Sequence, residues 1–542
     1  MPWGRGASVW GEDMKVAIFA SVVLAAATAS YAVAGHADIT PVHEQPAAPA
    51  LTPGLITLIS KAQEDLAKGD ATGALSDLRQ TIASPDFLTA PTEWRGGTLV
   101  SFVQVETKTF GEAAAFDSLV ELGTNTPGLR ATPEYQYVLM SAAYDLHKDA
   151  VAADALAALV RADPTLFARL GESGDFTVHD IVGRAWKLKD GTAVSLRLLE
   201  ALRDTGYHSQ NVFWSDEPKW FHLFEAYVAT GQDAKARALA ATFTEPLTLI
   251  QLRADKRYAA YAAGGPGRGD FKAALDAHLK DIKDLAAAHP RLLEGQVVLA
   301  TYFVTLNRPN DALKVLDDAT AAIKAAPEGQ PPYDDLDRQL SWVMDVRHRA
   351  LRIESTSSDD EARQKATDAQ AEADKIARAK NIDVVSQKIN LADTYFEIDQ
   401  NQKAVDTLAD IDLSRASPYG VMAAQEGRVC AYSGLGDKAN AKIALDYMKA
   451  HEGDSPVLLR DALRCAGDLD GLATFLIANL DDPSTRATTL AELQDYLPSP
   501  HTSAFTKREN AKDDQVRARP DVQAAIARYG TIDSYPIYWT PE

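Results

Sequence analysis

The chain has 542 residues, of which 46% are apolar and 24% are charged, and its formal net charge is -21. This length exceeds what one hydrophobic core usually serves, so the chain is either several domains or an array of repeats. Its acidic balance repels nucleic acid and anionic lipid, which excludes both as expected partners.

Residues 1–37 are typical of a secretory signal peptide. The apolar stretch VAIFASVVLAAATASYAVAG follows a lysine, and small residues allow cleavage after Ala34 or Ala37. Acidic residues just before Met14 suit a signal badly, so we expect Met14 to be the true start. A single membrane anchor is the alternative, although the stretch is weakly apolar for a permanent span. Cleavage would leave no membrane-spanning segment.

A linker and a long helical region are expected next. Residues 38–54 are rich in Pro and Ala and cannot build a core, so they are expected to be an extended linker. From residue 55 onward, helical periodicity continues almost throughout, and runs of alternating Val, Ile and Thr are scarce. The chain is therefore predicted to be all-α.

One pattern recurs along the helical region. In LFEAYVATGQDAKARALA, Tyr227 precedes a turn at Gly231, and Ala236 follows. The turn residue tolerates the left-handed conformation that ends a helix, and the small residue lets two helices cross closely. Matching sets are Tyr144, Lys148 and Ala153; Phe303, Asn307 and Ala312; Tyr395, Asp399 and Ala404; Tyr432, Gly436 and Ala441; Gly69 with Ala74; and Gly467 with Leu472.

This spacing resembles the tetratricopeptide repeat (TPR), a helix-turn-helix unit of roughly 34 residues. The resemblance implies a helical-hairpin solenoid, because neighbouring hairpins must stack to bury their apolar faces. A helical repeat of another period is the alternative. We expect the array to span 55–485, with Ser195 at one crossing position and a polar helical insertion at 353–380. Residues 486–542 are expected to form a charged, loop-like tail and a short capping helix.

Catalytic and cofactor signatures are weak. GGPGRG (264–269) lacks the Lys-Ser/Thr of a phosphate loop and follows no strand. Neither H-E-x-x-H nor G-x-S-x-G occurs, and the 11 histidines are scattered without metal-ligand spacing. We therefore expect a protein that is not an enzyme and has neither a cofactor nor a metal site.

The chain has 2 cysteines, Cys430 and Cys465. When the units are aligned on Gly436 and Gly467, both cysteines lie in the first helices of consecutive units. The TPR resemblance implies that both face the concave side. An exported protein meets an oxidising compartment, so a disulfide is allowed. Two unpaired small core residues are the alternative.

The first helices of TPR proteins line a groove that holds a peptide or a partner helix. The residues that the resemblance places toward this groove are Asp145, Glu225, Thr301, Asp393, Phe396, Glu397 and Glu426. Because many are acidic, we expect a protein partner with a basic segment. The alternatives are that the charges only solvate the helices, and that Phe396 is a core aromatic.

The resemblance and the signal together predict a non-catalytic, protein-binding scaffold that is exported to the periplasm or cell envelope. The alternative function is the helical support region of a cell-envelope enzyme that acts on polysaccharide.

Overall fold

The computed structural model describes residues 51–165, 172–262, 271–327, 329–354, 385–498 and 504–538. The predicted signal peptide, residues 38–50 of the linker, the GGPGRG loop and most of the polar insertion lie outside these residues. The described part divides into two compact units, residues 51–233 and residues 234–538.

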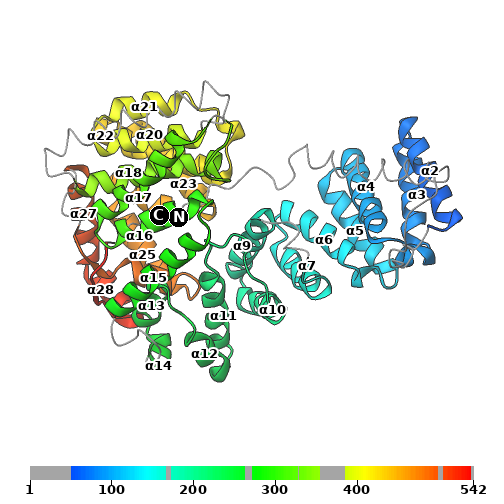
Figure 1. The fold of residues 1–542 in the computed structure, drawn as a ribbon, viewed down its shortest axis with the longest axis horizontal. Coiled ribbons are helices and arrows are strands. Elements are labelled where there is room, and N and C mark those ends of the chain that lie inside the picture. The colour runs from blue at the N-terminus through cyan, green and yellow to red at the C-terminus, as the bar shows by residue number, and fades with distance from the viewer. Residues whose placement is uncertain are drawn as a thin grey trace. The chain divides into compact units, whose positions relative to one another are not determined.

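The first unit consists of helical hairpins (Figure 1). Its elements are α2 (Pro53–Ala67), α3 (Ala71–Ala83), η1 (Pro85–Thr89), α4 (Thr92–Phe110), α5 (Glu112–Asn125), η2 (Leu129–Ala131), α6 (Pro133–Asp145), α7 (Asp149–Ala162), α9 (Glu172–Trp186), α10 (Gly191–Asp204) and α11 (Glu217–Ala229). Helices α2 and α3, α4 and α5, and α6 and α7 form successive hairpins, and each hairpin packs on the next.

The second unit continues the same architecture. Its helices are α12 (Asp233–Ala240), which begins at the boundary, α13 (Pro246–Ala254), η3 (Lys256–Tyr258), α14 (Ala259–Ala262), α15 (Phe271–Ala288), α16 (Leu293–Thr305), α17 (Pro309–Ala325), α18 (Leu336–Glu354), α20 (Val385–Glu397), α21 (Asn401–Ala409), η4 (Leu413–Arg415), α22 (Pro418–Leu435), α23 (Lys438–Ala450), η5 (Glu452–Asp454), α24 (Pro456–Ala466), α25 (Leu469–Asp481), α26 (Arg486–Glu492), α27 (Ala504–Arg517) and α28 (Pro520–Tyr529). Within the described ranges, no helix combines the length and apolarity that crossing a bilayer requires.

The hairpin turns have the predicted left-handed backbone. The residues with positive φ are Gly69, Gly231, Gly436 and Gly467, and the non-glycine residues His147, Asn307 and Asp399. At each of these turns the next residue donates its N–H to a carbonyl five residues back, as Gln232 does to Tyr227 at 2.8 Å. This bond satisfies a carbonyl that the end of the helix leaves open. The turn predicted near Lys148 is centred one residue earlier.

Small residues lie buried where the helices cross. The relative exposure is 0% at Ala74, Ala153, Ala236, Ala312 and Ala404, and also at Ser195. A larger side chain at these positions would hold the two helices apart. The prediction of an all-α, TPR-like helical-hairpin solenoid is therefore confirmed.

The C-terminal region differs in part from the prediction. The stretch predicted to be loop-like contains helix α27, whereas α28 is the predicted short capping helix and packs on α25. A charged sequence without apolar periodicity gave no signal for α27, which forms against other helices. Two short parallel strands, β1 (Asp495–Tyr496) and β2 (Ser534–Tyr535), flank this pair of helices.

The end of the second unit packs against its beginning. Helix α26 contacts α13, and Gly530 forms an antiparallel bridge with Asp255. Thr531 donates its N–H to the Ala254 carbonyl at 2.9 Å. Ala254 belongs to the same buried core as Leu490 of α26. Figure 1 shows this seam, where α13 (green) lies beside α28 (red).

Candidate functional site

The first helices of three late repeats, α20, α22 and α24, pack in succession and form one surface, the first-helix face. Gly427 of α22 lets α20 come close. A Cβ at this position would lie 3.1 Å from Leu408 Cδ1 and 3.3 Å from Asp393 Oδ1. The carboxylate of Asp393 therefore lies against the backbone of α22, beside the residue that follows Glu426.

Two acids of this face, Glu426 and Asp393, have carboxyl oxygens that are enclosed, although Asp393 as a residue is half-buried. Glu426 is 9% exposed, and Asp393 Oδ1 is buried with no hydrogen-bond partner in the described part of the chain. Burial raises the pKa of both carboxyls well above its usual value, and the charge of Glu397 raises that of Asp393 further. Asp393 and Asp461 add to the raised pKa of Glu426, and Arg464 opposes it. Protonation or an incoming cation would relieve this cost.

Tyr419 lies in the first turn of α22 and is half-buried. Burial raises the pKa of its hydroxyl to about 12, and the neighbouring acids Asp393, Glu426 and Asp461 contribute to the rise. The hydroxyl therefore stays protonated at neutral pH and offers a hydrogen-bond donor beside carboxylates.

Two arginines of α24 border the acids. Arg460 pairs with Glu492 of α26 and lies 3.3 Å from Asp461. Arg464 lies 3.2 Å from Asp461 and 3.0 Å from Asp513 of α27. Each guanidinium is thus shared between a carboxylate of its own helix and one from a later helix.

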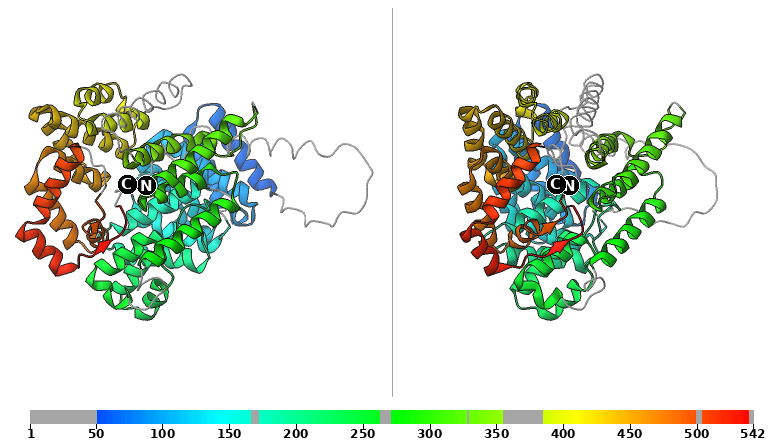
Figure 2. Two further views of the ribbon diagram at one scale, coloured as in Figure 1. Left: turned by 60° about the vertical axis from the view of Figure 1, so that its left-hand side comes forward. Right: turned by 90° about the vertical axis from the view of Figure 1, so that its left-hand side faces the viewer.

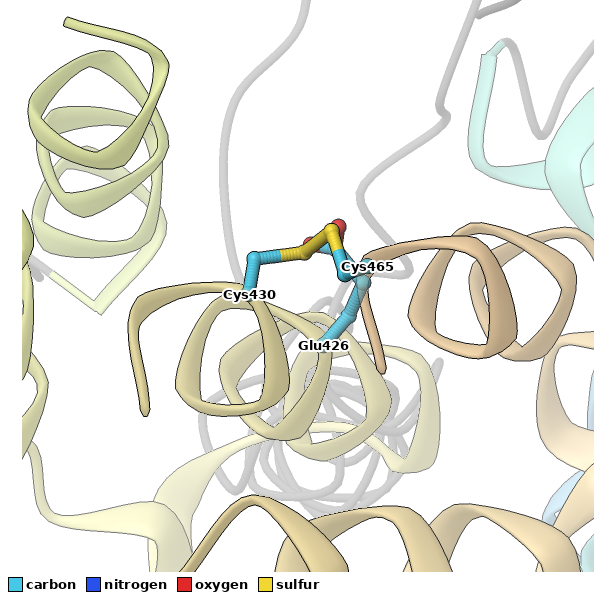
Figure 3. Close-up of side chains that lie close together, drawn as sticks. All are labelled: Glu426, Cys430 and Cys465. Carbon is cyan, nitrogen blue, oxygen red and sulfur yellow. A yellow bond between two sulfur atoms is a disulfide. The ribbon is translucent and has the colours of Figure 1, made fainter. Parts of the chain in front are cut away.

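A disulfide joins Cys430 of α22 to Cys465 of α24 (Figure 3). The Cα atoms lie 4.9 Å apart across a sequence separation of 35 residues, so the proximity expected from the repeat alignment is confirmed. Cross-linking a loop of this length stabilises by roughly 3–4 kcal/mol on the chain-entropy model. The bridge fixes two first helices to each other.

Glu426 lies next to this disulfide, with Oε1 3.2 Å from the sulfur of Cys430. The carboxyl oxygen and the two sulfurs lie within 4.8 Å of one another. Cysteine binds a metal ion as its thiolate, whereas these two sulfurs are bonded to each other. With the disulfide formed, Glu426 is a carboxyl group packed against the two bonded sulfurs.

The residues predicted to face a groove are only partly brought together. Asp393, Glu397 and Glu426 share the first-helix face. Asp145 is exposed at the end of α6, in the other unit. Thr301 of α16 donates its hydroxyl to the carbonyl of its own helix at Val297, at 2.9 Å.

Two of these predictions are corrected by burial. Glu225 is 5% exposed, and its carboxylate lies 3.1 Å from the His222 ring, which stacks on Trp186. Phe396 is also 5% exposed, and its ring centroid lies 5.3 Å from that of Phe505. Glu225 is thus held within its own unit, and Phe396 is covered by α27 instead of facing an open groove.

The residues that sequence reasoning missed are Tyr419, Arg460, Asp461 and Arg464. A signal existed in LLRDALRCA, where the two arginines are one helical turn apart on an amphipathic helix. Their carboxylate partners on α26 and α27 come from distant parts of the sequence.

Comparisons with known proteins give no family. No protein-family model matches the chain, and no curated protein matches it. Among solved structures, a Naa15/Naa10 complex bound to HypK-THB is similar over 87% of this chain and 67% of that chain, with 14% identity and a TM-score of 0.21. At so low a TM-score, the fold assignment rests on the helical hairpins themselves.

Proposed function

We propose that this chain is a non-catalytic scaffold that binds another protein through the first-helix face. The observation that carries the proposal is the pair of carboxyls on neighbouring first helices: that of Glu426 is buried, and that of Asp393 has an enclosed oxygen without a hydrogen-bond partner in the described part of the chain. Burial raises the pKa of both. Buried acids cost free energy when charged, and a basic group of a partner would offset that cost. The proposed partner therefore presents a basic segment.

The repeat architecture supports binding as the role. Stacked hairpins give a large surface that exists before the partner arrives, so association requires little reorganisation. The disulfide between α22 and α24 makes this part of the surface more rigid.

We also propose export to the periplasm or cell envelope. The apolar stretch after Met14 is the signal, and the Cys430–Cys465 bridge suits an oxidising compartment. N-terminal sequencing of the protein from its native cell tests this proposal. A mature chain beginning near Gly35 or Asp38 supports it, and one that retains Met14 contradicts it.

Site-specific crosslinking in the native cell tests the binding face. A photoreactive phenylalanine analogue replaces Tyr419 on α22 in one variant and Tyr447 on α23 in the other. Both tyrosines are half-buried aromatics, and Tyr447 stacks on His451, the residue that follows the second helix α23. We expect a discrete protein crosslink from position 419 and none from position 447.

The same crosslinking in cell-envelope extract, where the salt concentration can be set, provides a second readout. Capture at position 419 should decline as salt rises from about 0.05 M to about 0.5 M, because screening weakens attraction between charged surfaces. Equal crosslinking from both positions, or capture that salt leaves unchanged, would count against the first-helix face as the binding surface.

A further inference from the structure

Helix α27 lies over part of the first-helix face and contacts α20, α24 and α25. Figure 2 shows α27 and α28, in red, running alongside the gold and orange helices of the last repeats. We propose that α27 is an internal occupant of the partner site, and that a partner helix of similar chemistry displaces it. This inference rests on the proposed function.

The N-terminal half of α27 is held by an aromatic contact and a charge pair. The rings of Phe505 and Phe396 lie 5.3 Å apart. Arg508 donates from both terminal nitrogens to Asp399, at 3.2 and 2.5 Å. Asp399 is the left-handed turn residue at the end of α20. Arg508 therefore binds a turn residue of the repeat.

The C-terminal half docks on the end of α24. The ammonium group of Lys512 donates hydrogen bonds to the carbonyl oxygens of Arg464 and Cys465, at 2.9 and 3.4 Å. These carbonyls belong to the last turn of α24, where a cation also meets the negative end of the helix dipole. Asp513 pairs with the Arg464 side chain at 3.0 Å.

The contacting side chains follow one stripe of α27. The stripe consists of Phe505, Arg508, Glu509, Lys512, Asp513 and Val516, which recur at the three- and four-residue spacing of one helix face. It is mostly charged, and its buried members are Glu509 and Val516. A bound peptide helix has this kind of contact pattern, whereas a core helix buries a continuous apolar face.

The neighbouring helix α28 is attached differently. It buries three apolar side chains, Val522, Ala525 and Ile526, in the core of the second unit, whereas α27 buries one apolar side chain there, Val516. The Arg508–Asp399 pair of α27 is instead half in solvent, with side chains 52% and 46% exposed. Exposed ion pairs contribute little and weaken with salt. Helix α27 therefore has less apolar anchorage than α28 and is the one expected to detach first.

The contacts of α27 also define the chemistry of its competitor. The displacing partner is a helix with an aromatic residue, an arginine three residues later and a lysine seven residues after the aromatic. These positions reproduce Phe505, Arg508 and Lys512. A basic helix of this kind matches the acids of the first-helix face.

Hydrogen exchange on the full wild-type chain is the first test. We expect the amides of α27 to exchange faster than those of α28, and exchange in α27 to accelerate with salt while α28 is unaffected. If both helices exchange together at one rate under all conditions, α27 is an integral part of the fold and the proposal is overturned.

Peptide binding in trans is the second test. The probe is a fluorescent peptide of residues 504–517, with a scrambled peptide as its control. The variant Arg508→Glu should loosen the internal helix and bind the probe at least about tenfold more tightly than wild type does. The matched variant Lys507→Glu makes the same charge change at the adjacent exposed residue and should bind it as wild type does. Asp399→Lys should abolish binding.

The two proposals fail in different ways. If Arg508→Glu and wild type bind the probe equally, or if neither binds it, occupancy by α27 is wrong even when position 419 crosslinks a partner. If the probe binds as expected, and the crosslink at position 419 increases in Arg508→Glu relative to Lys507→Glu, α27 regulates the partner site. Probe binding without any crosslink at position 419 contradicts the proposed function and leaves the occupancy by α27 intact.

Discussion

At the scale of single residues, the buried acids of the first-helix face determine how stability depends on pH. Unfolded Asp and Glu titrate near pKa values of about 3.9 and 4.3. Burial raises the pKa of Asp393 and of Glu426 in the folded chain, so the folded state binds more protons than the unfolded state above about pH 4. The free energy of unfolding therefore falls as the pH rises from about 4 through the raised values.

Neutral replacements should remove this decline. We expect Asp393→Asn with Glu426→Gln to stabilise the chain by about 1 kcal/mol at pH 8 and to flatten its stability between about pH 5 and pH 8. Urea unfolding at the two pH values measures this, with Glu452→Gln at an exposed acid of η5 as the control. A steeper decline in the double variant would mean that the two acids are ionised and paired in the folded protein.

The buried hydroxyl of Ser195 also affects stability. It occupies a crossing position with 0% exposure, and its hydroxyl lacks a hydrogen-bond partner in the described part of the chain. Because an unsatisfied buried hydroxyl is costly, Ser195→Ala should stabilise the first unit by about 1 kcal/mol. Ser195→Val should destabilise it by about 1–3 kcal/mol through overpacking. Chemical denaturation measures the free energy of unfolding of the two variants. A higher value for Ser195→Val than for Ser195→Ala would contradict the close crossing of the helices.

At the scale of elements, each hairpin depends on the residue that ends its first helix. Gly436 has a φ of +75°, and a Cβ there would meet no atom within 4 Å. The cost of Gly436→Ala is therefore conformational, about 1–2 kcal/mol. The matched variant Gly453→Ala also has open space and lacks the positive φ, so its thermal midpoint should stay near wild type. Equal midpoints for the two variants would show that this turn does not need its left-handed residue.

The hairpins could be predicted because their signals are local. A turn residue such as Asn307 or Asp399 and the alanine five residues later lie in one stretch of sequence, and the structure shows left-handed backbone and burial at these positions. Helix α27 could not be predicted in the same way. Its face is charged, and Phe505, Arg508 and Lys512 acquire their partners from helices about 50 to 110 residues away.

The candidate site could likewise be predicted only in part. Sequence reasoning brought Asp393, Glu426 and the two cysteines to one face, because repeat alignment relates equivalent positions. It missed that α27 covers Phe396 and that Arg464 pairs with Asp513. Those contacts depend on where a non-repeat helix docks, and helical periodicity carries no information about that.

At the scale of the whole molecule, closure of the second unit depends on a glycine. A Cβ at Gly530 would lie 2.6 Å from the Ala254 carbonyl oxygen and 2.4 Å from Leu490 Cδ2. We expect Gly530→Ala to loosen the seam and to cost about 1–3 kcal/mol. Faster hydrogen exchange in α13 and α28 would report the opening.

The control for this variant is Gly420→Ala. Its Cβ would make ordinary contacts at 3.4 Å with Ala416 and Ser417, so the seam should exchange as in wild type. An unchanged seam in Gly530→Ala itself would show that Leu490 and the backbone of Ala254 can move aside without loss.

Closure also determines the order in which the second unit can form. Gln251 of α13 and Thr488 of α26, which hydrogen-bond at 3.1 Å, are 237 residues apart in sequence. An open solenoid can nucleate at any hairpin and grow through its neighbours, whereas joining such distant segments must first overcome loop-closure entropy. Hairpins assemble early during synthesis, whereas the seam cannot close fully until Gly530 has emerged from the ribosome. Until then, the apolar edge of α13 is a surface that a chaperone could protect.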